Sequence, residues 1–228
     1  MKRHILPILL ATLTLGVDAA EQKAGPHAVA EAPSPANLPA VALTPQLVYQ
    51  FLLAEIAGAR GQVGLSSDAY MDLARRTRDP RVARRAAEIA LFARHYDTAL
   101  EAARLWSELD PGAEGPRQMM SGLLSVTSRS EELAAHLSAE LQAAGNERGA
   151  LLMLLHRILA RHPDKLDAQK IVAKVTEPYL ALPEAHFARA QAAHGAKDTG
   201  VALSELDRAL SLRPDWEQAA LARAQMTG

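Results

Sequence analysis

Side chains that could hold a metal ion or act in acid–base catalysis are frequent in this chain, but their spacing does not bring them together. There are eight histidines and 26 aspartate or glutamate residues. His156 and His162 are six positions apart, and His186 and His194 are eight apart. Metal ligands on one helix usually converge at positions i and i+4. We therefore predict that the histidines lie on the surface or pack internally, and that the chain binds no metal.

The motifs of common catalytic and cofactor sites are absent from the sequence. There is no glycine-rich phosphate loop, no Gly-x-Ser-x-Gly elbow, no His-Glu-x-x-His pair and no cysteine. The formal net charge is −1, which gives no broad positive field for a phosphate backbone. The sequence therefore predicts no catalytic residue, no cofactor and no nucleic-acid partner. A hydrolase with an unfamiliar site is the outside alternative.

Arginines are concentrated between residues 75 and 94, and their guanidinium groups could bind carboxylates in a bidentate manner. The cluster consists of Arg75, Arg76, Arg78, Arg81, Arg84, Arg85 and Arg94. One hypothesis is that it docks a carboxylate-rich partner. The alternative is that it forms a solvated turn and outer helix face.

The elements that must position these side chains are helices. Hydrophobic residues make up 49% of the chain and aromatic residues only 4%, so strong helix formers dominate over β-formers. Thr44 followed by Pro45 has the pattern of a helix N-cap with proline at the first helical position. The sequence therefore predicts an all-α domain that begins at residue 44.

Two segments of the chain are similar to each other, residues 96–111 and residues 199–214. Each begins near an Ala-Leu pair, continues with apolar residues at helical spacing and ends at a proline. In both, the proline lies twelve positions after the first alanine. The prolines are 103 residues apart (214 − 111), which is close to three periods of about 34 residues. The spacing predicts two further repeats between the two copies, one upstream of them, and thus five helical hairpins.

The chain resembles the tetratricopeptide-repeat (TPR) family over residues 44–228. The match is carried by small or aromatic residues in phase with each terminal proline: Ala87, Ala99 and Trp106 before Pro111, and Ala190, Ala202 and Ala209 before Pro214. The resemblance implies a TPR-type α-solenoid of about five hairpins plus a last single helix, in which small residues lie where paired helices cross. Apolar residues also recur on one face of each second helix, which predicts an inter-helix core formed by Tyr96, Leu105, Trp106, Leu109, Leu203, Leu206 and Leu210.

Within that family the chain is similar to exported TPR lipoproteins of Gram-negative bacteria that are adaptors for a carboxyl-terminal processing protease (LbcA-like). This resemblance rests on the segments 43–57, 77–90, 182–188 and 212–217. The chain departs from the family in lacking the lipidated cysteine and several later repeats. The resemblance implies that the protein is an adaptor that binds a processing protease and its substrates. The alternative is an assembly factor for an envelope machine such as a pilus or secretion apparatus.

Family positions that face the inner groove of a TPR array point to a set of partner-binding residues. These are Phe51, Arg84, Glu88, Phe92, Phe187, Gln191 and His194. A mixture of apolar and polar side chains suits an extended or helical peptide. The alternative for the three phenylalanines is that they belong to the core.

The N-terminal segment has the pattern of a secretory signal peptide. Lys2 precedes an apolar run over residues 5–15, and Val17 and Ala19 place small residues at a cleavage site. We expect residues 1–19 to be cleaved and the protein to be exported to the periplasm. The alternative is an uncleaved membrane anchor, and we expect membrane association only through such an anchor or through a partner.

Two further expectations concern the ends of the folded domain. Residues 20–43 are rich in alanine and proline, which predicts a disordered linker before the TPR solenoid at 44–228. The last predicted helix has an exposed apolar side that includes Leu221. We expect the chain to be a shortened version of a longer protein, with self-association through this helix. The alternative is that the helix caps the array by itself.

Overall fold

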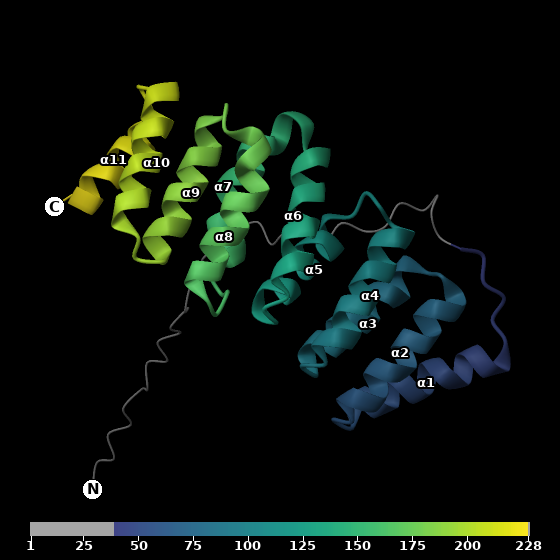
Figure 1. Ribbon diagram of the computed structural model, residues 1–228. Coiled ribbons are helices and arrows are strands. Elements are labelled where there is room, and N and C mark those ends of the chain that lie inside the picture. The colour runs from purple at the N-terminus through teal and green to yellow at the C-terminus, as the bar shows by residue number, and fades with distance from the viewer. Residues whose placement is uncertain (1–38, 228) are drawn as a thin grey trace, which may run out of the picture. The chain divides into compact units, whose positions relative to one another are not determined.

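The computed structural model describes residues 39–227 (Figure 1). The predicted signal peptide and most of the predicted linker lie outside the described residues. Between residues 39 and 227 the protein is helical without strands, in the order α1 (Pro45–Ala59), α2 (Val63–Thr77), α3 (Pro80–Phe92), α4 (Tyr96–Leu109), α5 (Glu114–Val126), α6 (Ser130–Ala143), α7 (Arg148–Leu159), α8 (Lys165–Thr176), α9 (Pro183–Gly195), α10 (Thr199–Leu212) and α11 (Glu217–Thr227). Short 3₁₀ turns, η2 (Gly145–Glu147) and η3 (Glu177–Tyr179), precede α7 and follow α8. Five consecutive hairpins followed by one helix confirm the predicted fold class.

Polar caps fix where several helices begin. The Oγ1 atom of Thr44 accepts a hydrogen bond from the backbone N–H of Leu47 at 3.3 Å, and Pro45 is the first residue of α1. This confirms the predicted start of the first helix. Asp79 caps α3 by accepting from the N–H of Arg81 at 2.8 Å. Burial acts to raise the pKa of Asp79, but the hydrogen bonds from Arg81 outweigh it and lower that pKa.

Four of the five hairpins turn in the same way. In each of them, the residue two positions before the second helix has a positive φ angle. These residues are Gly61, Arg94, Ser128 and Lys197. The next N–H then bonds the carbonyl five residues back, from Gln62 to Ala57, His95 to Ala90, Arg129 to Leu124 and Asp198 to Ala193, at 2.8 to 3.0 Å. These are the features of a Schellman turn. The α7–α8 hairpin departs from this pattern, because its turn contains the buried His162 followed by Pro163.

Side-chain size at the helix crossing differs between hairpins. The eighth residue of the first helix and the fourth residue of the second are both alanine in α3/α4 and in α9/α10, and these alanines are fully buried. The pairs are Ala87 with Ala99 and Ala190 with Ala202. The equivalent pairs are Ser121 with Leu133 in α5/α6 and Leu155 with Ala168 in α7/α8. Small pairs let two helices approach closely, whereas a leucine in either place keeps them apart.

The backbone packing follows this difference in side-chain size. α3 packs closely along α4, and α9 packs closely along α10. In contrast, α7 and α8 hardly approach each other, and α9 packs against both of them. The middle of the array is therefore more open than the hairpins on either side.

The predicted inter-helix core is confirmed for most of its members. Leu206 is fully buried, and Leu203 is half-buried. The remaining predicted residues are partly buried and pack against the core clusters: Tyr96, Leu105, Trp106, Leu109 and Leu210. The indole ring of Trp106 lies so close to Gly115 that a Cβ atom built on that glycine would be 2.5 Å from it. This contact joins α4 to the first turn of α5.

Candidate partner-binding site

Most of the arginine cluster is neutralised within the protein. Six of its seven members form ion pairs: Arg75 with Glu101, Arg76 with Asp72, Arg78 with Glu108, Arg81 with Asp79, Arg84 with Glu88 and Arg85 with Glu55. The pairs of Arg75 and Arg78 connect the end of α2 to α4. Only Arg94 has no ion-pair partner among residues 39–227. Three of these pairs join different helices and three are local to one helix, so the cluster is largely used inside the protein, which favours the alternative to a docking surface.

Three of the predicted groove residues lie together on α3. The guanidinium Nε of Arg84 is 2.8 Å from Oε1 of Glu88, and Arg84 also lies over the ring of Trp106, 5.9 Å from its centroid. The ring of Phe92 is 79% exposed. Glu88 and Phe92 contribute to a cleft of about 460 Å³ between α3 and the α1–α2 hairpin.

Phe51 lies on α1 and makes an aromatic contact within the first hairpin. Its side chain is half exposed, and its ring meets that of Tyr70 edge-on at 6.1 Å. The hydroxyl of Tyr70 donates a hydrogen bond to Glu55. Burial, followed by this hydrogen bond, raises the pKa of Tyr70 to about 12. Phe51 is thus accessible, but it does not line the cleft beside α3.

The assignment of Phe187 to the groove is wrong. Its side chain is 1% exposed and packs against Trp216, with 4.9 Å between ring centroids. Phe187 belongs to a small core cluster that includes Ala219 of α11. The last helix therefore covers the side of α9 that the family positions assign to the inner groove. Of the other predicted residues on α9, Gln191 is half-buried and His194 is exposed. The structure does not bring either into a cleft with the α3 residues.

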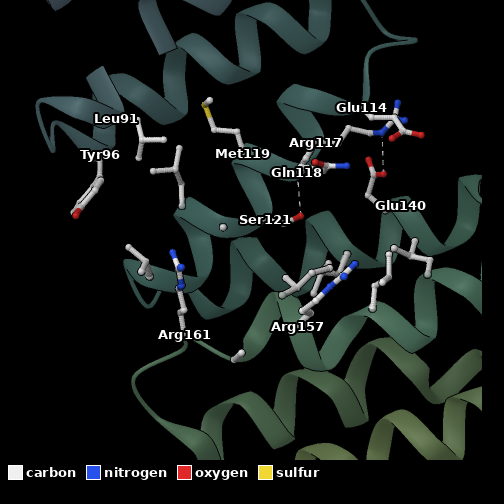
Figure 2. Close-up of a pocket in the computed structure, with 18 residues that line it drawn as sticks. Leu91, Tyr96, Glu114, Arg117, Gln118, Met119, Ser121, Glu140, Arg157 and Arg161 are labelled. Carbon is white, nitrogen blue, oxygen red and sulfur yellow. Dashed lines mark hydrogen bonds and ion pairs between the residues drawn. The ribbon is translucent and has the colours of Figure 1, made fainter. Parts of the chain in front are cut away.

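A larger cleft of about 870 Å³ lies between α5 and α7, bounded by α6 and by the turn between α3 and α4 (Figure 2). Its lining is mainly apolar. The apolar side chains are Leu91, Met119, Leu123, Val126, Leu137, Leu151, Leu154 and Ile158. Leu91, Val126 and Leu154 are each about 40% exposed, so an incoming apolar side chain would cover hydrophobic surface that water now contacts.

The two sides of this cleft carry different charges. On the α5–α6 side, Nε of Arg117 pairs with a carboxylate oxygen of Glu140 at 3.2 Å. On the α7 side, Arg157 and Arg161 extend into the hollow (Figure 2). Within residues 39–227, neither arginine has an ion pair or a side-chain hydrogen bond. The cleft therefore combines apolar walls with two guanidinium groups that have no partner in the part of the chain that the structure describes.

Sequence reasoning missed Arg157 and Arg161, although the chain contains a local signal for them. They are four positions apart, and neither has an acidic residue at three or four positions towards the N-terminus. The one acid within helical reach is Asp164, whose Oδ1 already accepts from the N–H groups of Leu166 and Asp167 at the start of α8. Two like charges four positions apart destabilise a helix when no acidic side chain is near. Such a pair is therefore a signal that the charges bind an acidic group elsewhere.

The described part of the chain offers little for metal or membrane chemistry. Across residues 39–227 no three histidine or acidic side chains are grouped closely enough to hold a metal ion. None of the helices in that range has the length and apolar character of a membrane-spanning segment.

Comparison with known proteins yields one curated relative. No family model matches the chain. Over 107 residues, or 47% of the chain, the sequence is 29% identical to the TPR repeat-containing protein PA4667 of Pseudomonas aeruginosa. The chain's match spans only 18% of that relative's length. This similarity, together with the order of hairpins, supports the TPR repeat family.

Several solved structures, two of them described as TPR proteins, also align with the chain at low similarity. YrrB, described as a TPR protein with an unusual peptide-binding site, is 15% identical with a TM-score of 0.37, over 78% of this chain and 92% of that one. MamA from Desulfovibrio magneticus RS-1 is 13% identical with a TM-score of 0.41, over 77% of this chain and 99% of that one. A thermophilic TPR protein from Thermus thermophilus is 17% identical with a TM-score of 0.35, over 79% of this chain and 98% of that one.

Proposed function

We propose that the protein is a non-enzymatic scaffold that binds partner proteins through the α5–α7 cleft. The observation that carries this proposal is the cleft itself, because it combines an apolar lining, in which Leu91, Val126 and Leu154 are about 40% exposed, with arginines that have no partner within residues 39–227. Exposed apolar patches rimmed by polar groups are typical of protein-interaction sites. Repeat arrays commonly bind partners along such surfaces.

The proposed role of the scaffold is that of an adaptor in the periplasm. Its basis is the resemblance to exported TPR proteins that recruit a carboxyl-terminal processing protease and its substrates. The signal-peptide pattern of residues 1–19 supports export. Fractionation of cells tests the location: the proposal expects the mature protein in the periplasmic fraction without detergent, and recovery of the full-length chain in the cytoplasm would contradict it.

Affinity capture from envelope extract tests the role. We expect the wild-type protein to retain a processing protease and an Arg157→Glu/Arg161→Glu variant to retain much less of it. The matched control is Lys170→Glu/Lys197→Glu, which changes the net charge equally at two exposed residues outside the cleft. Capture of pilus or secretion components instead would replace the adaptor role by that of an assembly factor. Equal capture by both double variants would exclude the cleft as the binding site.

A further inference from the structure

We infer that the α5–α7 cleft binds an extended segment of a partner protein in which acidic side chains flank an apolar one. This inference rests on the proposed scaffold function and specifies the chemistry of the segment. It follows from three features of the cleft: the shape and lining of the hollow, the two arginines at the end of α7 that have no acidic partner within residues 39–227, and the opposite charge on α5.

The lining suits the side chains of a polypeptide. The cleft is open on one side, and its apolar walls are interrupted by polar groups of Gln118 and Ser121. The Ser121 hydroxyl donates to the carbonyl of Arg117 at 3.0 Å and lies 3.0 Å from Nε2 of His136. Gln118 is exposed, so its amide is free to bond a peptide backbone. A lipid tail would be better accommodated by a closed and uniformly apolar cavity.

The charge on α7 selects for carboxylates. Most arginines of residues 39–227 have an acidic partner, but Arg157 and Arg161 have none there. A guanidinium group offers a planar fork of donors that matches a carboxylate. Arg157 lies near the end of α7 and Arg161 in the turn that follows, and both line the edge of an apolar surface. Because they are four positions apart, they can hold an acidic residue on either side of a buried apolar side chain.

The opposite charge on α5 determines which side of the cleft the carboxylates of the segment face. Glu114 lies in the first turn of α5 and lines the far side of the cleft, near the Arg117–Glu140 pair (Figure 2). Within the described residues Glu114 has no ion-pair partner. Carboxylates of the segment are therefore repelled from the α5 side and attracted to the α7 side. The apolar residue between them is expected to contact Leu154, which lies on α7 close to both arginines in sequence.

Selection from a random decapeptide library displayed on phage, with the whole protein as bait, tests the inference. We expect the enriched peptides to carry a net negative charge and a central leucine, isoleucine or phenylalanine. Fluorescence anisotropy of labelled enriched peptides should then show binding that is roughly tenfold or more weaker to Arg157→Glu/Arg161→Glu. Binding to Lys170→Glu/Lys197→Glu should match the wild type. The neutral variant Arg157→Gln/Arg161→Gln should lie between the two, and circular dichroism should show all variants folded.

Several outcomes would overturn the inference. These are enrichment of neutral or basic peptides, equal binding to both charge-reversed variants, or no enrichment at all. Displacement of the peptides by oleate, with oleate binding lost in Arg157→Glu/Arg161→Glu, would assign the cleft to an anionic lipid instead. If a processing protease is still captured by that variant, the adaptor role stands and only the assignment of the cleft fails.

Discussion

The hairpins α3/α4 and α9/α10 differ from the hairpins between them in the size of two side chains. Where the flanking hairpins have alanine at both crossing positions, the middle ones have Leu133 in α5/α6 and Leu155 in α7/α8. All of these residues are buried, so the difference lies in how far apart the helices are held. The large cleft opens on the first helices of these two middle hairpins.

This comparison teaches that departure from the repeat consensus creates the candidate binding site. A leucine at the crossing prevents close contact within its hairpin. In these two hairpins Val126 of α5 and Leu154 of α7 remain about 40% exposed, although most other apolar side chains of the two helices are buried. The four predictions that follow break or sharpen this difference between the two kinds of hairpin.

The largest expected effect is the removal of the leucines. Leu133→Ala and Leu155→Ala each remove a fully buried side chain, and we expect a loss of about 2–5 kcal/mol in the free energy of unfolding. Urea titration followed by circular dichroism measures this loss. The control is Leu166→Ala, since Leu166 is 59% exposed and its truncation should cost far less. A loss below about 1 kcal/mol at both buried sites would mean that they do not hold the helices apart.

The converse change fills the tight crossings. Ala99→Leu and Ala202→Leu insert methylene groups where both partner helices touch, and we expect each to cost about 1–3 kcal/mol through overpacking. Thermal melting compares these variants with Ala173→Leu, which enlarges an exposed alanine on α8. If these variants melted at the same temperature as the control, there would be room for a leucine between the paired helices, and the close packing at Ala99 and Ala202 would be contradicted.

A third prediction concerns the junction between a tight hairpin and an open one. Gly115→Ala places a Cβ atom 2.5 Å from the ring of Trp106, so we expect a net loss of about 1 kcal/mol despite the better helix propensity of alanine. Gly122→Ala is the matched change on the same helix. No atom lies within 4 Å of the added Cβ there, and we expect a gain of roughly 0.4–1 kcal/mol. If both variants changed the free energy of unfolding in the same direction, the close contact between Gly115 and Trp106 would be contradicted.

The smallest expected effect comes from the ion pairs around the tight hairpins. Arg78 lies 2.6 Å from Glu108, and both side chains are more than half exposed. Exposed pairs contribute about 0–1 kcal/mol, so Arg78→Ala should change the unfolding free energy by no more than that. A double-mutant cycle with Glu108→Ala measures the pair directly. A larger coupling energy between Arg78 and Glu108 would show that ion pairs, as well as small crossing residues, stabilise the close packing of these helices.

The repeat order of the fold could be predicted from the sequence because local signals agree with it. The spacing of Ala99 and Ala202 to their prolines set the phase, and Thr44 with Pro45 marked the first helix. Phe187 could not be placed, since its burial depends on Trp216 and α11, which lie beyond its own repeat. Likewise, the ion-pair partners of Arg75 and Arg78 are 26 and 30 positions away in the chain, about one repeat.

The candidate site was harder to predict than the fold, because it arises from an irregularity of the repeats. The family template directs attention to the same positions in every repeat, and on α3 it identified Arg84, Glu88 and Phe92 beside the smaller cleft. It gave no reason to examine Arg157, which lies outside those positions. Leucine at a crossing position and arginines without an acid one turn before them are the two local signals that point to the larger cleft.

Site-specific photo-crosslinking from inside the cleft tests the central claim most directly. Gly122 lines the cleft and Gly195 lies at the end of α9, and at both positions an added Cβ atom would meet nothing within 4 Å apart from its own helix backbone. We expect p-benzoylphenylalanine at Gly122 to form an adduct with a partner protein in envelope extract, and the adduct to be lost when Arg157→Glu/Arg161→Glu is added. The same probe at Gly195 should form none. Equal adducts from the two positions, or an adduct from Gly195 alone, would contradict the account.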